Sequence, residues 1–151
     1  MNTFIAEVIN IEPAEVVSFI QVRHDSGIKL RIIKSNLPEW VSVGDKIECK
    51  IQEASVCVSK ECPGRVSIEN RLKGVLKEVR SNDSLCELTF ESPLGEVVAL
   101  ITRLAFEELD LEVEAEATIL IRGVDVLIEP YIDAFDTLEL HKAISRTKDA
   151  N

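Results

Sequence analysis

Apolar and polar residues alternate along most of the first sixty residues, which is the period expected of half-buried β-strands. The predicted strands of this half cover residues 4–11, 16–23, 28–32, 46–51 and 54–58. A turn at Asp25 to Gly27 separates the second strand from the third. Residues 35–40, with Pro38 among them, predict a capped short helix or a turn.

The second half of the chain repeats the same order of elements. Its predicted strands cover residues 72–79, 85–91, 97–102, 115–121 and 124–128, with a short helical stretch at 104–109. Ala6 aligns with Gly74 and Ser55 with Asp125, so a nearly constant shift relates the two halves. We interpret this repeat as an internal duplication.

Five short strands with a turn or helix between the third and the fourth favour a closed barrel, because closure hides the strand edges of a small unit. We therefore predict an all-β protein of two tandem OB-like five-stranded antiparallel β-barrels, with a short C-terminal helical tail. The barrels are assigned to residues 1–61 and 67–130, and the tail to 131–151. Pro63 and Gly64 mark the turn between the barrels.

Composition narrows the class of protein further. The 151 residues carry a net charge of −10, which argues against a broad nucleic-acid surface because phosphate binding depends on clustered Lys and Arg. No apolar run reaches the roughly 18 residues that a membrane span requires, and the first residues lack the pattern of a signal peptide. We expect a cytoplasmic protein that binds neither nucleic acid nor membrane.

Enzymatic and metal chemistry find little support in the sequence. The four cysteines, at positions 49, 57, 62 and 86, form no C-x-x-C pair, and only His24 and His141 could accompany them at a metal. We interpret the cysteines as reduced and partly buried, and predict no metal site. Neither a nucleophile with its base nor a phosphate-binding loop is recognisable, so the chain is predicted not to be an enzyme.

One octet carries the strongest functional signal, namely Ser67-Ile-Glu-Asn70-Arg-Leu72-Lys-Gly74. This S-x-x-N-x-L-x-G motif, followed by a strand-rich half, resembles the molybdate-binding Mop domain, which is called TOBE when it is fused to transporter ATPases. The resemblance implies the same OB-like fold, with molybdate or tungstate as bound ligand and no organic cofactor. It also implies that sites form between domains, where the motif of one domain meets the third strand and the fourth-strand end of another.

The resemblance assigns oxyanion-binding positions in this chain. They are Ser67, Ile68, Glu69 and Asn70 in the motif, Thr102 at the end of the third strand, Ala105 just after it, and Arg122 with Gly123 after the fourth. Hydroxyls, backbone N–H groups and a guanidinium are the donors that a tetrahedral dianion needs. Ala105 lacks the hydroxyl common at its position. A carboxylate at position 69 repels a dianion unless it points away or is neutralised by Arg65, Arg71 or Arg103. A turn or strand-entry cap is the structural alternative for Ser67 and Asn70.

The first copy has lost most of these donors. No serine precedes Asn2 at the motif spacing, Ile33 falls near the place of Thr102, and Gln52 with Glu53 replaces Arg122 with Gly123. Lys34 and Ser35 are the nearby donors, and residues of an edge turn are more often solvated than bound to a ligand. We expect this copy to have a structural role.

The leading hypothesis is a protein that binds molybdate or tungstate for storage, buffering or sensing in molybdenum homeostasis. Because the better motif lies in one copy, a homo-oligomer, dimer or trimer, is expected, in which second copies meet across subunits. The alternative is a degenerate Mop interaction module that partners a molybdate transporter ATPase or a regulator without binding anion. An OB-fold nucleic-acid binder ranks last, since the chain is acidic and has few aromatic residues.

Overall fold

A computed structural model describes residues 1–132 of the chain. The strands are β1 (Asn2–Glu12), β2 (Ser18–His24), β3 (Lys29–Lys34), β4 (Lys46–Ile51), β5 (Cys57–Ser59), β6 (Asn70–Ser81), β7 (Leu85–Ser92), β8 (Gly95–Thr102), β9 (Glu116–Ile121) and β10 (Leu127–Pro130). The helical elements are α1 (Arg103–Leu109) and two 3-10 turns, η1 (Glu53–Ser55) and η2 (Gly123–Asp125). The predicted tail helix falls almost entirely outside the described residues.

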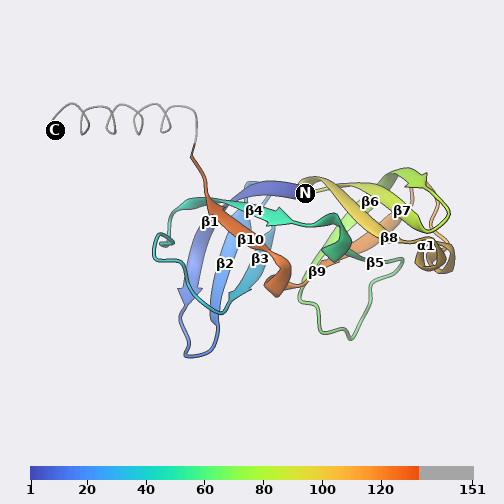
Figure 1. Ribbon diagram of the computed structural model, residues 1–151. Coiled ribbons are helices and arrows are strands. Elements are labelled where there is room, and N and C mark those ends of the chain that lie inside the picture. Colours follow the sequence, from blue (N-terminus) through green and yellow to red (C-terminus); the bar gives the residue numbers. More distant parts are fainter. Residues whose placement is uncertain (133–151) are drawn as a thin grey trace, which may run out of the picture.

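The described residues form two five-stranded antiparallel sheets, which lie side by side along the long dimension of the molecule (Figure 1). One sheet has the strand order β10-β4-β1-β2-β3, and the other has the order β5-β9-β6-β7-β8. This arrangement confirms the predicted all-β class with two OB-like units. Residues 35–40 form a turn rather than a helix, so the only α-helix among the described residues is α1, in the second half.

The fifth strands of the two sheets are exchanged between the halves of the chain. Strand β5 pairs with β9, with Cys57 opposite Leu120, while β10 pairs with β4, with Leu127 opposite Lys50. Neither of the predicted segments 1–61 and 67–130 therefore contains all five strands of its sheet. The exchange follows from η1 and η2, because each 3-10 turn contacts the edge strand of the opposite sheet and carries the chain across.

Equivalent irregularities in the two sheets support the predicted duplication. The pairing of β1 with β2 shifts register between Val8 and Asn10, and that of β6 with β7 shifts between Leu76 and Glu78. In both halves the backbone at the start of the shift bonds to the loop before the fourth strand, as in the 2.8 Å bond from the Val8 N–H to the Asp45 carbonyl. A β-bulge increases the local twist of a strand, which helps a short sheet to close.

Alternating burial along the strands builds one continuous core from both sheets. In β1 the side chains of Phe4, Ala6 and Val8 face inward and those between them face solvent. Gly74 keeps β6 close to its neighbours, since a Cβ atom there would lie 2.7 Å from Cδ1 of Ile119. The four cysteines are unpaired, two of them buried. Among the described residues no helix is long and apolar enough to cross a membrane.

Candidate oxyanion site at the junction of the two sheets

Two asparagine side chains join the sheets in a reciprocal manner. The Asn70 side chain donates to the Arg31 carbonyl and accepts from the Arg31 N–H, both at 2.8 Å, on the outer edge of β3. Asn2 makes the same two bonds, also at 2.8 Å, to the backbone of Val98 on the outer edge of β8. Each asparagine thus acts as one residue of an added strand and satisfies an exposed sheet edge.

We name the two regions by the edge strands that they cover. The β3 junction comprises residues 67–70 and 122–124 against β3. The β8 junction comprises residues 1–2 and 52–55 against β8. Contacts between η2 and β3 and between η1 and β8 show that the two junctions share one geometry.

The β3 junction holds a cavity of about 160 Å³. It is lined by Ser67, Ile68, Glu69, Arg122 and Gly123 together with Ile33 and Val124. Five of the eight predicted site residues therefore meet around one space, and Asn70 lies beside it, bonded to β3. The motif and the fourth-strand end come from the same half of the chain, and the third strand comes from the other half.

Arg71 shapes the loop that carries the motif. Its guanidinium donates to the carbonyls of Gly64, Val66 and Ile68 at 2.8–2.9 Å. These bonds turn three carbonyl oxygens of the loop toward Arg71. The exposed hydroxyl of Ser67 is left at the cavity wall.

Gly123 allows the close approach of η2 to β3. A Cβ atom at this position would lie 2.6 Å from the Arg31 carbonyl oxygen and 3.4 Å from the Ile33 nitrogen. Backbone groups of alternate residues in an edge strand point to the same side. Because Arg31 presents its N–H outward to Asn70, the Ile33 N–H also points outward, toward the cavity.

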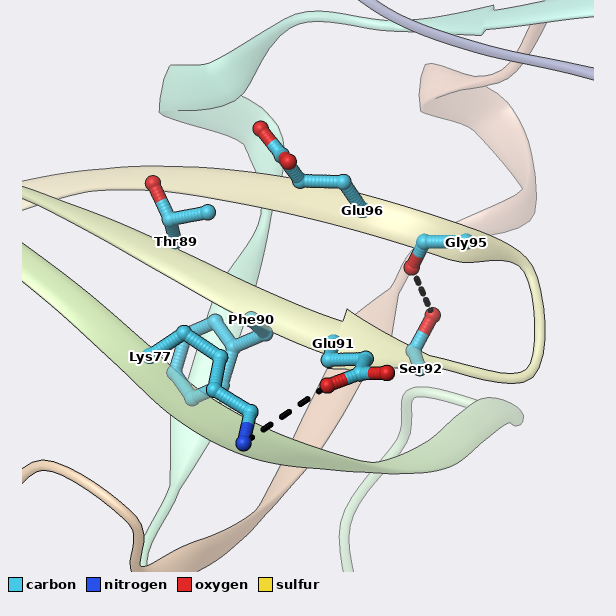
Figure 2. Close-up of a pocket in the computed structure, with 7 residues that line it drawn as sticks. All are labelled: Lys77, Thr89, Phe90, Glu91, Ser92, Gly95 and Glu96. Carbon is cyan, nitrogen blue, oxygen red and sulfur yellow. Dashed lines mark hydrogen bonds and ion pairs between the residues drawn. The ribbon is translucent and has the colours of Figure 1, made fainter.

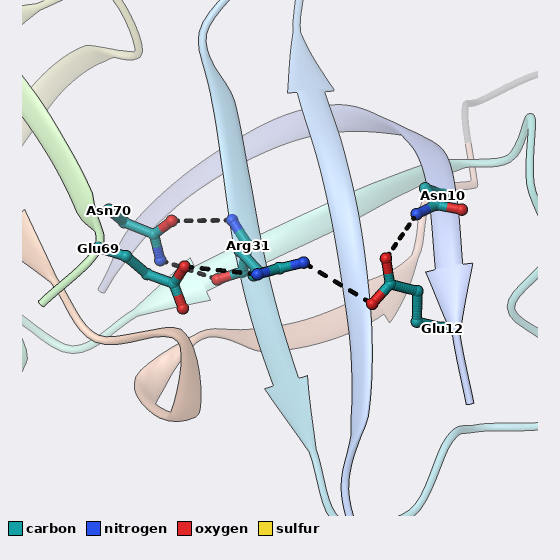
Figure 3. Close-up of polar contacts among 5 residues, drawn as sticks. All are labelled: Asn10, Glu12, Arg31, Glu69 and Asn70. Atoms are coloured by element: carbon teal, nitrogen blue, oxygen red, sulfur yellow. Dashed lines mark hydrogen bonds and ion pairs between the residues drawn. The ribbon is translucent and has the colours of Figure 1, made fainter. Parts of the chain in front are cut away.

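Charged groups at this junction are paired with one another (Figure 3). Arg31 lies 3.8 Å from the carboxylate of Glu69 and 3.7 Å from that of Glu12. Arg71 and Arg103, which were predicted to neutralise Glu69, have other partners. Arg71 binds carbonyls of the loop, and Arg103 pairs with Glu107. Arg31 comes from the other half of the chain, which sequence spacing does not indicate.

Arg122 supplies the cation that lines the cavity itself. Its side chain is 58% exposed and its Nε lies 2.8 Å from a carboxylate oxygen of Asp125. The short η2 turn brings these two residues together. The pair leaves the terminal nitrogens of the guanidinium without a partner from Asp125.

Lys34, expected to be solvated, is partly buried and donates to the Val126 carbonyl. Burial is the main cause that lowers the pKa of Lys34. Burial also raises the pKa of the neighbouring Cys49 thiol to about 12. The prediction for Lys34 is therefore wrong, because the exchange of strands places the end of β3 against the chain that follows η2.

Thr102 and Ala105 do not line the cavity of the β3 junction. The Thr102 hydroxyl accepts a bond from the Ala105 N–H at 3.1 Å and caps the N-terminus of α1. Thr102 is the last residue of β8 and Ala105 lies in α1, whereas the motif faces β3. Within one chain these two predicted site residues are thus separated from the other six.

The β8 junction has a different chemistry. Here the Met1 ammonium pairs with the Glu53 carboxylate, and Glu53 occupies the place of Gly123 in the repeat. Hydrogen bonding to that ammonium lowers the pKa of Glu53. The β8 junction therefore has a carboxylate residue at the position where the β3 junction has a glycine.

A larger hollow of about 370 Å³ lies on the second sheet, between β6, β7 and β8 (Figure 2). Its cation, Lys77, pairs with Glu91 at 3.6 Å and with Glu114 at 3.0 Å. Glu96 adds another carboxylate to the wall. This excess of negative charge makes the hollow unsuitable for a dianion, in spite of its size.

Three residues of the β3 junction were not predicted, namely Arg31, Ile33 as a donor, and Val124. Arg31 and Ile33 come from the first half of the chain, which was predicted to have only a structural role. The outward direction of the Ile33 N–H is a property of the backbone, which no residue type reveals. Among the described residues no group of three or more His, Cys, Asp or Glu could hold a metal ion.

Comparisons with known proteins agree with this architecture. Among solved structures the chain is similar to the cytoplasmic molybdate-binding protein ModG, in a crystal form with molybdate bound. The identity is 22% and the TM-score 0.80, and the match covers 86% of this chain and 96% of that chain. The fold therefore defines a protein of tandem OB-like barrels.

A family model matches the second half of the chain. Residues 66–128 match the family model of the TOBE domain. The match confirms the resemblance read from the motif at 67–74 and agrees with a binding protein rather than an enzyme. No curated protein matches the chain.

Proposed function

We propose that the chain is a cytoplasmic protein that binds molybdate or tungstate for storage, buffering or sensing of the oxyanion. The observation that carries the proposal is the β3 junction, where the motif loop, Arg122 and Gly123 meet an outward backbone N–H of β3. The TOBE match and the likeness to a molybdate-binding protein support the same ligand.

The chemistry of the junction suits a small tetrahedral dianion. Its donors are the Ser67 hydroxyl, backbone N–H groups, including that of Ile33, and the Arg122 guanidinium. Charge-assisted bonds of this kind are about twice as strong as neutral ones. A cavity of about 160 Å³ equals the share of roughly five water molecules, which is room for an anion with four oxygens.

A homo-oligomer, dimer or trimer, is part of the proposal. The resemblance gives Thr102 and Ala105 a role at the anion, yet both lie at the start of α1 on the side of β8. A second subunit could bring its own Thr102 to the β3 junction of the first. In this arrangement Thr102 and Ala105 would reach the anion without any change in the fold of a single chain.

A second candidate is supported by the ion pairs. Arg31 and Arg122 both have carboxylate partners within the chain, so the junction is already neutralised. On this alternative the protein is an interaction module that binds a transporter ATPase or a regulator without anion. Its binding to such a partner would not depend on molybdate.

Calorimetric titration with molybdate and tungstate tests the proposal. The wild type should give saturable heats, and Ser67→Ala and Arg122→Ala should each weaken binding by roughly 10- to 100-fold, since a bond to a charged group contributes about 1.5–3 kcal/mol. Arg80→Ala is the matched control, because Arg80 is exposed and pairs with Glu78 of its own strand, β6. Equal, unsaturable heats for all four proteins would reject anion binding and favour the interaction module.

A further inference from the structure

Arg31, which belongs to the first sheet, contacts Glu69, a residue that lines the cavity in the β3 junction. Residues two apart in a strand point to the same face, so the side chains of Arg31 and Ile33 lie on one side of β3. Ile33 lines the cavity. Glu69, which also lines it, is 3.8 Å from Nη1 of Arg31. The guanidinium therefore lies beside a residue of the cavity wall.

Three groups position Arg31, and Figure 3 shows two of them, Asn70 and Glu12. Asn70 binds both backbone groups of the residue at 2.8 Å. The guanidinium lies over the ring of Phe19, 5.2 Å from its centre. The carboxylate of Glu12, on β1, lies 3.7 Å from Nη2. A cation fixed in this way loses little conformational freedom when it binds a ligand.

The partners of Arg31 do not use its hydrogen-bonding capacity. Its contacts to Glu12 and Glu69, at 3.7 and 3.8 Å, are longer than N–H···O hydrogen bonds, which end near 3.2 Å. A guanidinium carries five N–H donors in a planar fork. The side chain is also 43% exposed, so these donors are accessible.

We propose that Arg31 is a second cationic ligand of the oxyanion and that Glu69 is its counter-ion in the empty site. This inference rests on the proposed function. On binding, two anion oxygens replace the long contact to Glu69 with short charge-assisted bonds, and the Glu69 carboxylate turns to solvent. Glu69 is half exposed, so it can turn without disturbing the core.

The counter-ion makes the site selective for charge. A ligand must compete with one carboxylate for the guanidinium, and a dianion is attracted more strongly than a monoanion. Molybdate and tungstate should therefore bind much better than a monoanion of similar size such as perchlorate. Replacing Glu69 by Gln should raise the affinity for both kinds of anion and reduce the difference between them.

Arg31 could instead act only as the neutraliser of Glu69, and a double-mutant cycle separates the two roles. In both cases Arg31→Gln weakens binding in the wild type, because Glu69 is left unpaired beside the anion. Only a ligand role makes Arg31→Gln costly when Glu69 is already Gln. The fork of the guanidinium also predicts that Arg31→Lys restores only part of the affinity.

The experiment is calorimetric titration of molybdate into the wild type, Glu69→Gln, Arg31→Gln and the double variant. We expect Glu69→Gln to tighten binding by about fivefold, and the double variant to bind at least tenfold more weakly than Glu69→Gln. Equal affinity of the double variant and Glu69→Gln would overturn the ligand role. Circular dichroism and thermal unfolding check that each variant is folded.

The chain provides a matched control pair. Arg23 and Glu7 lie on neighbouring strands at the same 3.8 Å spacing, with side chains 47% and 46% exposed. Arg23→Gln and Glu7→Gln should leave molybdate binding unchanged. If these two control variants change the affinity for molybdate as much as Arg31→Gln and Glu69→Gln do, the effect is one of overall charge. The inference about Arg31 then fails.

The result also distinguishes this inference from the proposed function. If the wild type gives no saturable heat, both are rejected. If the wild type binds and Ser67→Ala weakens it, while Arg31→Gln has no effect in the Glu69→Gln background, only the role of Arg31 is rejected.

Discussion

The two junctions of this molecule share a framework and differ in their chemistry. In each of them an asparagine binds an edge strand through two bonds and a 3-10 turn packs beside it. The β3 junction adds a serine, an arginine and a glycine around a cavity, whereas the β8 junction has Met1 paired with Glu53. The asparagine contact is therefore a structural device, and the residues beside it decide whether a junction can hold an anion.

Both junctions depend on the exchange of β5 and β10 between the two halves of the chain. Strands β5 and β10 each complete the sheet of the other half. A change that separates the halves should thus affect both junctions together, while a change within one junction should leave the other intact.

The largest effect is expected from separating the halves. The fragments 1–62 and 65–151, produced alone, should fail to fold, because each lacks the fifth strand of its sheet and exposes apolar residues. A protease site inserted at the turn of Pro63 and Gly64 should give a cut chain that still elutes as one particle in size-exclusion chromatography. Two folded fragments that elute separately would contradict the exchange.

The next largest effect is expected at Gly123. A methyl group there would lie 2.6 Å from the Arg31 carbonyl oxygen, so Gly123→Ala should force η2 away from β3. Overpacking of this kind costs about 1–3 kcal/mol, and we expect the upper part of that range. Urea unfolding measures the loss, and titration should show weaker molybdate binding.

Glu53 provides the control for Gly123. It occupies the same place in the β8 junction and already carries a side chain, so Glu53→Ala should change the free energy of unfolding by less than about 1 kcal/mol. Similar losses for Glu53→Ala and Gly123→Ala would show that the two junctions are not packed differently.

A smaller effect separates the roles of the two asparagines. Asn70→Ala leaves the outward N–H and carbonyl of Arg31 without partners, and Asn2→Ala does the same at Val98. Each should lower the free energy of unfolding by about 1–2 kcal/mol. Only Asn70→Ala should also weaken molybdate binding, as titration can show. An equal loss of binding in Asn2→Ala would place an anion at the β8 junction.

The smallest effect concerns Lys34, which burial disfavours in its charged form. Between its lowered pKa and the ordinary value of 10.5, the unfolded chain binds more protons at this residue than the folded chain. This contribution makes the free energy of unfolding rise with pH across that window. Urea unfolding at several pH values should show the rise in the wild type relative to Lys34→Met. Parallel curves for the two proteins would exclude it.

Much of the fold could be predicted because it depends on local patterns. Alternation of apolar residues located the core of each strand, since one face of each is buried. The first residues of the predicted strands 54–58 and 124–128 form η1 and η2 instead. The partner of β5 or β10 could not be predicted, because an alternating pattern gives the buried face of a strand and not the sheet edge that it joins.

The candidate site could also be predicted only in part. The motif and Arg122 could be found because they lie close to recognisable sequence features. Arg31 could not, because its relation to Glu69 exists only between halves of the chain. Thr102 had a local signal of its own, as a hydroxyl three residues before the N–H that it caps.

The β3 junction is the place where we propose that the oxyanion binds. Anomalous diffraction from crystals of the full chain grown with tungstate tests it most directly, since tungsten is a strong scatterer. We expect a tungsten peak within bonding distance of the Ser67 hydroxyl, the Arg122 guanidinium and the Ile33 N–H, and none beside Glu53. A peak at the β8 junction, or none at the β3 junction at saturating tungstate, would contradict it.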